Sequence, residues 1–282
     1  MKVSYYPGCS LHGTVKEYDQ SVKTVSRALG VELKEIEDWS CCGATSGHAT
    51  NFKLSVALPA RNLMIAKGEA KEMMVPCAAC FNRFKSAQYH LRHDEALKKE
   101  VEEIVGQKYT PGLDVKSPID ILYNDIGLDA LKAKVVKKLT GLRPVSYYGC
   151  LLVRPPEVCN FEDYENPYML DGILATLGAD VKNWSYKTDC CGGSLTISRT
   201  DIVGKLVDKL MTMAREAGAN CVVTACPVCM ANLDARASEN LRLPVFYFTE
   251  LVALALGLPG TSTWFKLHNV DPLPLVSSLG LL

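Results

Sequence analysis

Short apolar runs alternate along the chain with amphipathic helical segments, and this alternation predicts an α/β fold. Runs rich in Val and Tyr at 2–7 and 144–148 are expected to be strands, and each ends at a Gly-Cys pair. Apolar residues at helical spacing predict helices at 14–29 and 166–178, the second opened by Asn-Pro and closed near Gly178.

The remaining segments continue the alternation. Strands are expected in VELKEIE, VKNWSY, MMVPC and CVVTAC, and helices at about 53–67 and 201–217. VELKEIE and VKNWSY each lead into a Cys-Cys-Gly turn, while the other two strands each lead into a Cys-x-x-Cys that opens a further helix. Every such cysteine is therefore expected at a strand end, a turn or a helix start.

The cysteines show that the chain contains an internal repeat. In the first set, Cys9 is followed after 31 residues by Cys41-Cys42 and after 34 more by Cys77-x-x-Cys80. The second set repeats this order with intervals of 39 and 34 residues. Its members are Cys150, Cys190, Cys191, Cys226 and Cys229. Five cysteines in the same order, at nearly the same spacing, indicate a duplicated module.

The text around the cysteines repeats as well. VSYYPGC matches VSYYGC, DWSCCGATS matches KTDCCGGSL, and VPCAAC matches TACPVC. The stretch VFYFTELVALALG is the expected counterpart of the region that carries PIDILYNDIG. We therefore expect two homologous modules packed together, at 1–143 and 144–282, each with an extension beyond its cysteines.

Charge and hydropathy exclude several classes of function. The formal net charge is zero, and no basic stripe argues for nucleic-acid binding. The N-terminus lacks the apolar run of a signal peptide, and the longest strongly apolar stretch, near 251–258, is far too short to span a membrane. These features predict a cytoplasmic protein with no direct membrane insertion.

Twelve cysteines in a cytoplasmic chain point to metal or redox chemistry rather than to disulfides. A Cys-x-x-Cys at a helix start places two sulfurs on one side of a turn, where the helix N–H groups favour the thiolate that binds metal. Adjacent cysteines in a strand point to opposite faces, so the glycine after each Cys-Cys pair is expected to let both face one site.

Five thiolates per module is an informative number. A structural zinc takes four ligands, and so does an ordinary four-iron cubane. The fifth thiolate favours an iron–sulfur cluster that is larger or more open than a cube. Zinc in one module and disulfides remain alternatives on the residues alone.

These motifs resemble the cysteine-rich CCG domain, and the duplicated form is similar to the B subunit of heterodisulfide reductase, in its bacterial type. The resemblance covers essentially the whole chain. It includes ARNL near Arg61, YNDIG at 123–127 and the His-x-x-Asp-Pro segment that begins at His268.

The resemblance implies two noncubane [4Fe-4S] clusters, with a disulfide held between them and reduced or formed there. By resemblance, the first cluster would be bound by Cys9, Cys41, Cys42, Cys77 and Cys80. The second would be bound by Cys150, Cys190, Cys191, Cys226 and Cys229. The implied activity is that of an oxidoreductase acting on a sulfur group.

The sequence departs from the methanogen form of the family in two places. Leu151 stands where a histidine is expected after the second Gly-Cys, and the segment SLHGTVKEY after Cys9 also differs. Both flank the expected substrate gap, so the substrate need not be the coenzyme M–coenzyme B heterodisulfide.

Several residues lie outside the repeat. Cys221 sits in an apolar run and is expected to be a small buried hydrophobe, and Cys159 follows the Pro-Pro pair, where it could approach the substrate gap. His12 and His48 are candidates to donate a proton to a departing thiolate, with a polar turn role as the alternative.

No G-x-G-x-x-G follows a strand, and no ferredoxin-like Cys-x-x-Cys-x-x-Cys run is present. The chain is therefore expected to depend on a ferredoxin-like iron–sulfur subunit and a flavin-containing subunit of the same complex. Two other functions stay open. One is an iron–sulfur electron-transfer subunit of a quinone-linked oxidoreductase, and the other is a zinc-stabilised binding module.

Overall fold

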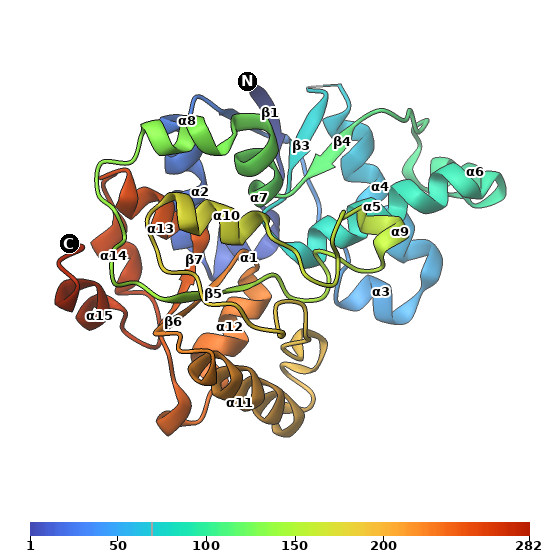
Figure 1. The fold of residues 1–282 in the computed structure, drawn as a ribbon. Coiled ribbons are helices and arrows are strands. Elements are labelled where there is room, and N and C mark those ends of the chain that lie inside the picture. The colour runs from blue at the N-terminus through green and yellow to red at the C-terminus, as the bar shows by residue number, and fades with distance from the viewer. Residues whose placement is uncertain (69) are drawn as a thin grey trace.

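The computed structural model describes residues 1–68 and 70–282, and its strands form two separate parallel sheets (Figure 1). The first sheet has the order β2 (Glu32–Glu35), β1 (Lys2–Tyr5), β3 (Glu72–Met74) and β4 (Asp114–Lys116). The second has the order β5 (Pro144–Tyr147), β6 (Cys221–Thr224) and β7 (Val245–Tyr247). The fold is α/β, as the sequence predicts.

Helices connect the strands within each half. The first half contains α1 (Gly8–Gly13), α2 (Lys16–Ala28), α3 (Ser46–Thr50), α4 (Phe52–Ala66), α5 (Ala78–His93), α6 (Glu95–Val105), α7 (Pro118–Asp120), the π-helix η1 (Ile121–Ile126) and α8 (Leu128–Ala133). The second contains α9 (Pro156–Cys159), α10 (Met169–Thr176), η2 (Gly193–Leu195), α11 (Thr200–Glu216), α12 (Pro227–Arg236), η3 (Glu239–Leu241), α13 (Phe248–Ala255), α14 (Thr261–Phe265) and α15 (Leu273–Ser278).

Apart from β2, which has no counterpart strand, the two halves repeat the same strand order, and this confirms the duplication. In each sheet the strand that ends at Gly-Cys pairs with the strand that ends at Cys-x-x-Cys, and a last strand, β4 or β7, lies beyond it. Val3 and Val145 are fully buried, as are Tyr5 and Tyr147. Continuous burial is expected for parallel strands covered on both faces.

One strand predicted from the sequence is wrong. VKNWSY, at 181–186, is not a strand, although VELKEIE does form β2. Lys182 N donates to Pro144 O at 2.8 Å, but the next contact with β5 comes from a side chain, because Trp184 Nε1 donates to Ser146 O at 2.9 Å. On this edge of the second sheet, the Trp184 indole therefore bonds to β5 where the backbone of a further strand would otherwise do so.

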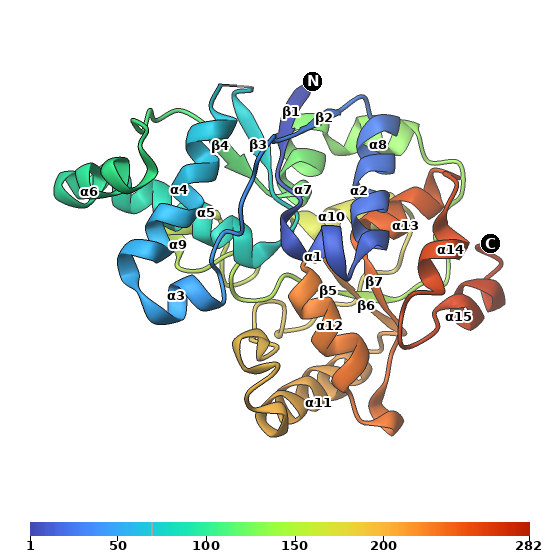
Figure 2. The ribbon, with the colours of Figure 1, turned by 180° about the vertical axis from the view of Figure 1, so that it is seen from behind.

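Helices of the two halves pack against each other in several places. Helix α2 lies against α13, and α10 lies against η1, and α2 and α13 remain side by side in both views (Figures 1 and 2). The second contact is close, because a Cβ on Gly172 would lie 2.9 Å from the ring of Tyr123. The cysteine-bearing ends of the two sheets are brought together between these helices.

Candidate functional site

The first cysteine set gathers at the carboxyl ends of β1 and β3. Cys9 lies in α1 directly after β1, the Cys41-Cys42 turn follows β2, and Cys77 is the N-cap residue of α5. Parallel strands end at one edge of their sheet, so residues that follow several strands meet there. The thiol of Cys42 reaches that of Cys80, with 3.1 Å between the sulfurs.

The second set has the same arrangement. Cys191 Sγ lies 3.6 Å from Cys229 Sγ, which matches the Cys42–Cys80 contact in the first set. The turns agree as well. Gly192 N donates to Cys190 Sγ at 3.3 Å, as Gly43 N donates to Cys41 Sγ at 3.4 Å. The repeat seen in the sequence is therefore a repeat of sulfur positions.

Hydrogen bonds lower the pKa of thiols in both Cys-Cys turns. Hydrogen bonding with Cys41, and next with Cys80, lowers the pKa of Cys42 to about 4. In the second set, the thiol of Cys150 and the N–H groups of the following glycines lower the pKa of Cys190 to about 6. Thiolate is the form in which cysteine binds metal.

A glycine before the first cysteine of each set leaves room for a sulfur from the helix start. Gly8 has φ +70°, and a Cβ there would lie 3.4 Å from Cys80 Sγ. Gly149 has φ +68°, and its Cβ would lie 2.9 Å from Cys229 Sγ. The backbone conformation favours glycine at both positions, and at Gly149 the close approach of the sulfur favours it as well.

We expect Gly149→Ala to destabilise the chain by about 1–3 kcal/mol more than Gly218→Ala, because the added methyl group overpacks against Cys229. Gly218 is a matched control, since it has φ +80° but no atom lies within 4 Å of the place its methyl group would take. Urea unfolding of both variants under anaerobic, reducing conditions measures the difference. Equal losses would mean that backbone conformation alone demands glycine at 149.

The two sets meet at the middle of the molecule. The thiols of Cys77 and Cys226, one from each set, are both buried and lie near enough to shift each other's pKa. A cavity of about 110 Å³ lies beside them. It is lined by all five cysteines of the second set, by Tyr148, Leu151, Gly193, Ser194 and Val228, and by Ala44, Thr45, Ala78 and Ala79 of the first half.

These sulfur contacts are pairwise. Among residues 1–68 and 70–282, no three His, Cys, Asp or Glu side chains converge on the position of a single metal ion.

A buried asparagine ties the first half to the loop after Cys150. Asn82, two residues past Cys80 in α5, donates to Leu151 O at 3.2 Å and to Arg154 O at 2.8 Å, and lies 3.4 Å from Cys159 Sγ. The sequence gives no sign of this role, because the equivalent position of the repeat is Ala231. A residue that acts between two modules is needed only once.

We expect Asn82→Ala to lower the free energy of unfolding by about 1–3 kcal/mol, because the partly buried carbonyl groups of Leu151 and Arg154 would keep only the weak thiol donor of Cys159. Asn183→Ala is the control, since this asparagine is exposed and should change stability by less than about 0.5 kcal/mol. Chemical unfolding gives both values, and hydrogen exchange of 151–159 should quicken only in Asn82→Ala. A change no larger than that of Asn183→Ala would contradict the expectation.

The structure does not bring the two candidate histidines to the sulfurs in the same way. His12 is exposed and pairs with Glu35 at 2.9 Å. His48 Nδ1 lies 2.7 Å from Arg83, whose charge lowers the pKa of His48. Burial lowers the pKa of the Arg83 guanidinium, and the nearby Cys42 and Cys159 only partly oppose this effect. His48 thus belongs to a polar chain that reaches the first set, whereas His12 occupies a surface ion pair.

Arg61 and Arg154 also make ion pairs. Arg61 pairs with Asp38, and Arg154 pairs with Glu165 at 2.7 Å. These contacts account for both arginines without a role at the sulfurs.

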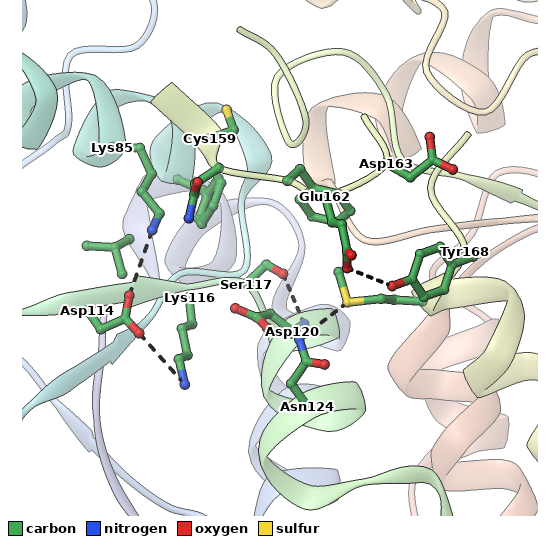
Figure 3. A pocket seen from close by; sticks show the side chains of 15 residues that line it. Lys85, Asp114, Lys116, Ser117, Asp120, Asn124, Cys159, Glu162, Asp163 and Tyr168 are labelled. Carbon is green, nitrogen blue, oxygen red and sulfur yellow. Dashed lines mark hydrogen bonds and ion pairs between the residues drawn. The ribbon is translucent and has the colours of Figure 1, made fainter. Parts of the chain in front are cut away.

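Cys159 lies behind the loop rather than in the cysteine-lined cavity. It is buried, its thiol lies 3.3 Å from Arg154 O, and burial raises its pKa to about 11. It lines a separate polar cavity of about 410 Å³ (Figure 3), where Lys85 faces Asp114 and Glu162 accepts from Tyr168. Cys221 is fully buried in β6, as expected for a small hydrophobe.

The comparison with protein families identifies the repeat. A model of the cysteine-rich CCG domain matches residues 3–85 and 145–234, which contain all ten cysteines of the two sets. The chain belongs to the CCG family.

Relatives of this CCG protein include subunits of several reductases. It is 30% identical to the 8-methylmenaquinol:fumarate reductase membrane anchor subunit of Wolinella succinogenes over 95% of this chain and 96% of the relative. It is 28% identical to a protein of Archaeoglobus profundus that is described as like the B subunit of heterodisulfide reductase, with 91% of each chain covered. The B subunit of a CoB-CoM heterodisulfide reductase of Methanosarcina acetivorans is 24% identical over 91% of this chain and 89% of its own.

The same architecture occurs in a solved structure of a hypothetical protein from Helicobacter pylori. The two structures have a TM-score of 0.71 and share 10% sequence identity. The likeness covers 95% of the CCG protein and 51% of the other chain. The likeness shows the fold alone. Within the part of the chain that the structure describes, no helix is long and apolar enough to cross a membrane.

Proposed function

We propose that this CCG protein is the catalytic subunit of a heterodisulfide-reductase-like complex. It would reduce or form a disulfide with electrons that pass one at a time through two noncubane [4Fe-4S] clusters. The observation that carries the proposal is that two five-cysteine sets lie close together, with Cys77 and Cys226 near enough to shift each other's pKa. A cavity beside Cys226 is lined by the five cysteines of the second set and by residues of the first half.

The residues present fit such clusters. Each set supplies five thiols, the ligand type that iron–sulfur clusters take, and hydrogen bonds favour thiolate at Cys42 and Cys190. The lack of a side chain at Gly149 lets the backbone approach Cys229 Sγ closely. The first set would hold one cluster and the second set the other.

The chemistry explains why two sets are needed. Reduction of a disulfide consumes two electrons and two protons and yields two thiols, and a pair of one-electron centres supplies the electrons in single steps. The chain would contribute the walls around the bond. Leu151, Ala78 and Val228 line the cavity and would exclude water from it. The carbonyl of Leu151 is held by Asn82, so this wall has a fixed position.

Leu151 also bears on the substrate. An apolar side chain in the cavity wall offers no hydrogen bond to a polar or charged group, so we propose a disulfide other than the methanogen heterodisulfide. The electrons would come from a ferredoxin-like iron–sulfur subunit, and through it from a flavin-containing subunit. The relatives that are named as subunits support a place in a complex.

Anaerobic purification with iron, sulfide and zinc analysis tests the proposal. We expect about eight irons per chain, and an EPR signal that appears when a thiol is added. About two zinc ions and a colourless protein would instead support a zinc-stabilised binding module.

The relative from W. succinogenes favours a second candidate, an iron–sulfur electron-transfer subunit of a quinone-linked oxidoreductase. Both candidates predict iron, so the thiol response discriminates between them. About eight irons without any EPR change on thiol addition would support electron relay and would overturn disulfide chemistry.

A further inference from the structure

A single buried tyrosine contacts both Cys-x-x-Cys loops. Tyr18 lies in α2 of the first half and has no exposed surface. Its hydroxyl donates to Ala225 O at 2.9 Å and lies 3.4 Å from Pro76 O. These two carbonyl groups directly precede Cys226 and Cys77. One phenol thus holds the backbone at equivalent points of the two repeats.

The surroundings of Tyr18 keep it in place. Its ring stacks on that of Tyr247, with centroids 4.0 Å apart and an angle of 4° between the planes. One turn further along α2, the hydroxyl of Ser21 lies 2.7 Å from that of Thr249 in α13. Helices α2 and α13 run side by side there, as Figure 2 shows. The position of the phenol is therefore set by the interface between the halves.

The loops that Tyr18 joins carry two cysteines that lie close to each other. Cys77 and Cys226 belong to different sets and are near enough to shift each other's pKa. Two redox centres ligated by neighbouring residues in a buried, low-dielectric site feel each other's charge strongly. Groups that orient metal ligands from behind also tune the metal centre itself.

We propose that Tyr18 is a positioning residue that fixes the coupling between the two clusters. By holding the carbonyl groups before Cys77 and Cys226, it sets how far the charge and spin of one cluster act on the other. The two clusters would then have separate reduction potentials, because the charge of the first electron makes the addition of the second less favourable. This inference rests on the proposed pair of clusters.

Tyr247 provides a matched control. Its ring stacks on Tyr18 and is buried to the same extent, but its hydroxyl has no hydrogen-bond partner among the described residues. Tyr18→Phe and Tyr247→Phe therefore remove the same atom from two stacked rings. Only the first removal breaks contacts with the cysteine loops.

The experiment compares the complete wild-type chain with both variants after anaerobic purification. Iron content, a redox titration and EPR spectra are measured, the spectra in the state where both clusters are paramagnetic. We expect all three proteins to hold about eight irons. Tyr18→Phe should lose the spin–spin splitting of the signal and bring the two reduction steps together. Tyr247→Phe should keep both features of the wild type.

The outcomes separate this inference from the proposed function. A wild-type chain without iron overturns the proposed clusters themselves. The role of Tyr18 alone is overturned if the clusters show no spin coupling, or if Tyr18→Phe keeps the wild-type splitting and potentials. Equal changes in Tyr18→Phe and Tyr247→Phe assign the effect to ring packing and also overturn it.

A further substitution covers the case in which Tyr18→Phe does not fold. 3-Fluorotyrosine in place of Tyr18 keeps the ring and the hydroxyl but makes the hydroxyl a stronger donor. It should shift the splitting while iron content stays unchanged. An unchanged splitting in this protein overturns the inference as well.

Discussion

Replacing Cys191 with serine is expected to halve the iron content and abolish disulfide turnover. Cys191 is buried and lies 3.6 Å from Cys229, and Asn232 donates to its carbonyl oxygen at 3.0 Å. Serine keeps the size and the hydrogen bonds but replaces a soft thiolate ligand with a hard hydroxyl. Iron should fall from about eight to about four per chain, because the first set is intact.

Turnover should disappear although one cluster remains, because a single one-electron centre cannot deliver two electrons to one bond at once. Cys42→Ser is the equivalent change in the first set and should give the same result. Cys221→Ala is the control, since this buried cysteine lies outside both sets. Iron analysis and a dithiol-coupled assay measure the effect. Retention of about eight irons in Cys191→Ser, or their loss in Cys221→Ala, would contradict the assignment of ligands.

The second large effect is expected at a buried ion pair near the end of the second half, between His268 and Glu250. His268 Nε2 lies 3.0 Å from Glu250 Oε1, and both side chains are almost fully buried. His268 Nδ1 lies 2.9 Å from Val245 O, and Glu250 accepts from Tyr247 N at 2.9 Å. We expect His268→Ala to destabilise the chain by about 3–5 kcal/mol, because it leaves the Glu250 carboxylate buried without a cationic partner.

Chemical unfolding at neutral pH measures this loss. The double variant His268→Gln/Glu250→Gln should be clearly more stable than His268→Ala, because it removes both charges and retains an acceptor for Tyr247 N. His93→Ala, at an exposed histidine, should change stability by less than about 0.5 kcal/mol. If His268→Ala lowered the free energy of unfolding as little as His93→Ala, the ion pair would contribute nothing to stability.

The same pair predicts a pH dependence. Burial by itself lowers the pKa of His268, but the hydrogen bond and charge of Glu250, with that of Asp234, outweigh it and raise the pKa. Glu17 faces the same cluster, and burial raises its pKa. The stabilisation by His268 is complete below its unfolded pKa of about 6.5 and is lost as the pH rises through the folded value. This decline above about pH 6.5 should be absent from the double variant.

Much of the fold follows from local sequence signals. The Val- and Tyr-rich runs form β1 and β5, and Pro227 opens α12 because a helix start tolerates a missing N–H. VKNWSY has the composition of a strand but lacks a backbone partner beyond Lys182, since Trp184 bonds to β5 through its indole. Composition cannot distinguish these two ways of covering a sheet edge.

The cysteine sets were visible in the sequence because each motif occurs twice. Asn82 and Tyr18 were not, because each acts between the halves and has no copy. The closeness of Cys77 to Cys226 also depends on how the halves pack, and nothing in the spacing of either set encodes it. The sequence could therefore predict what each half contains but not what joins the two.

The packing of helices of one half against the other predicts how the chain behaves when it is divided. Helix α2 covers α13, and α10 covers η1, so each half completes the surface of the other (Figure 1). If the chain were divided at 134–143 and the two fragments were produced separately, each would expose the apolar face that packs against the other. Such fragments should aggregate. Produced together, they should reassociate into a native complex. The architecture is thus that of two repeated modules, joined in one chain, that cover each other.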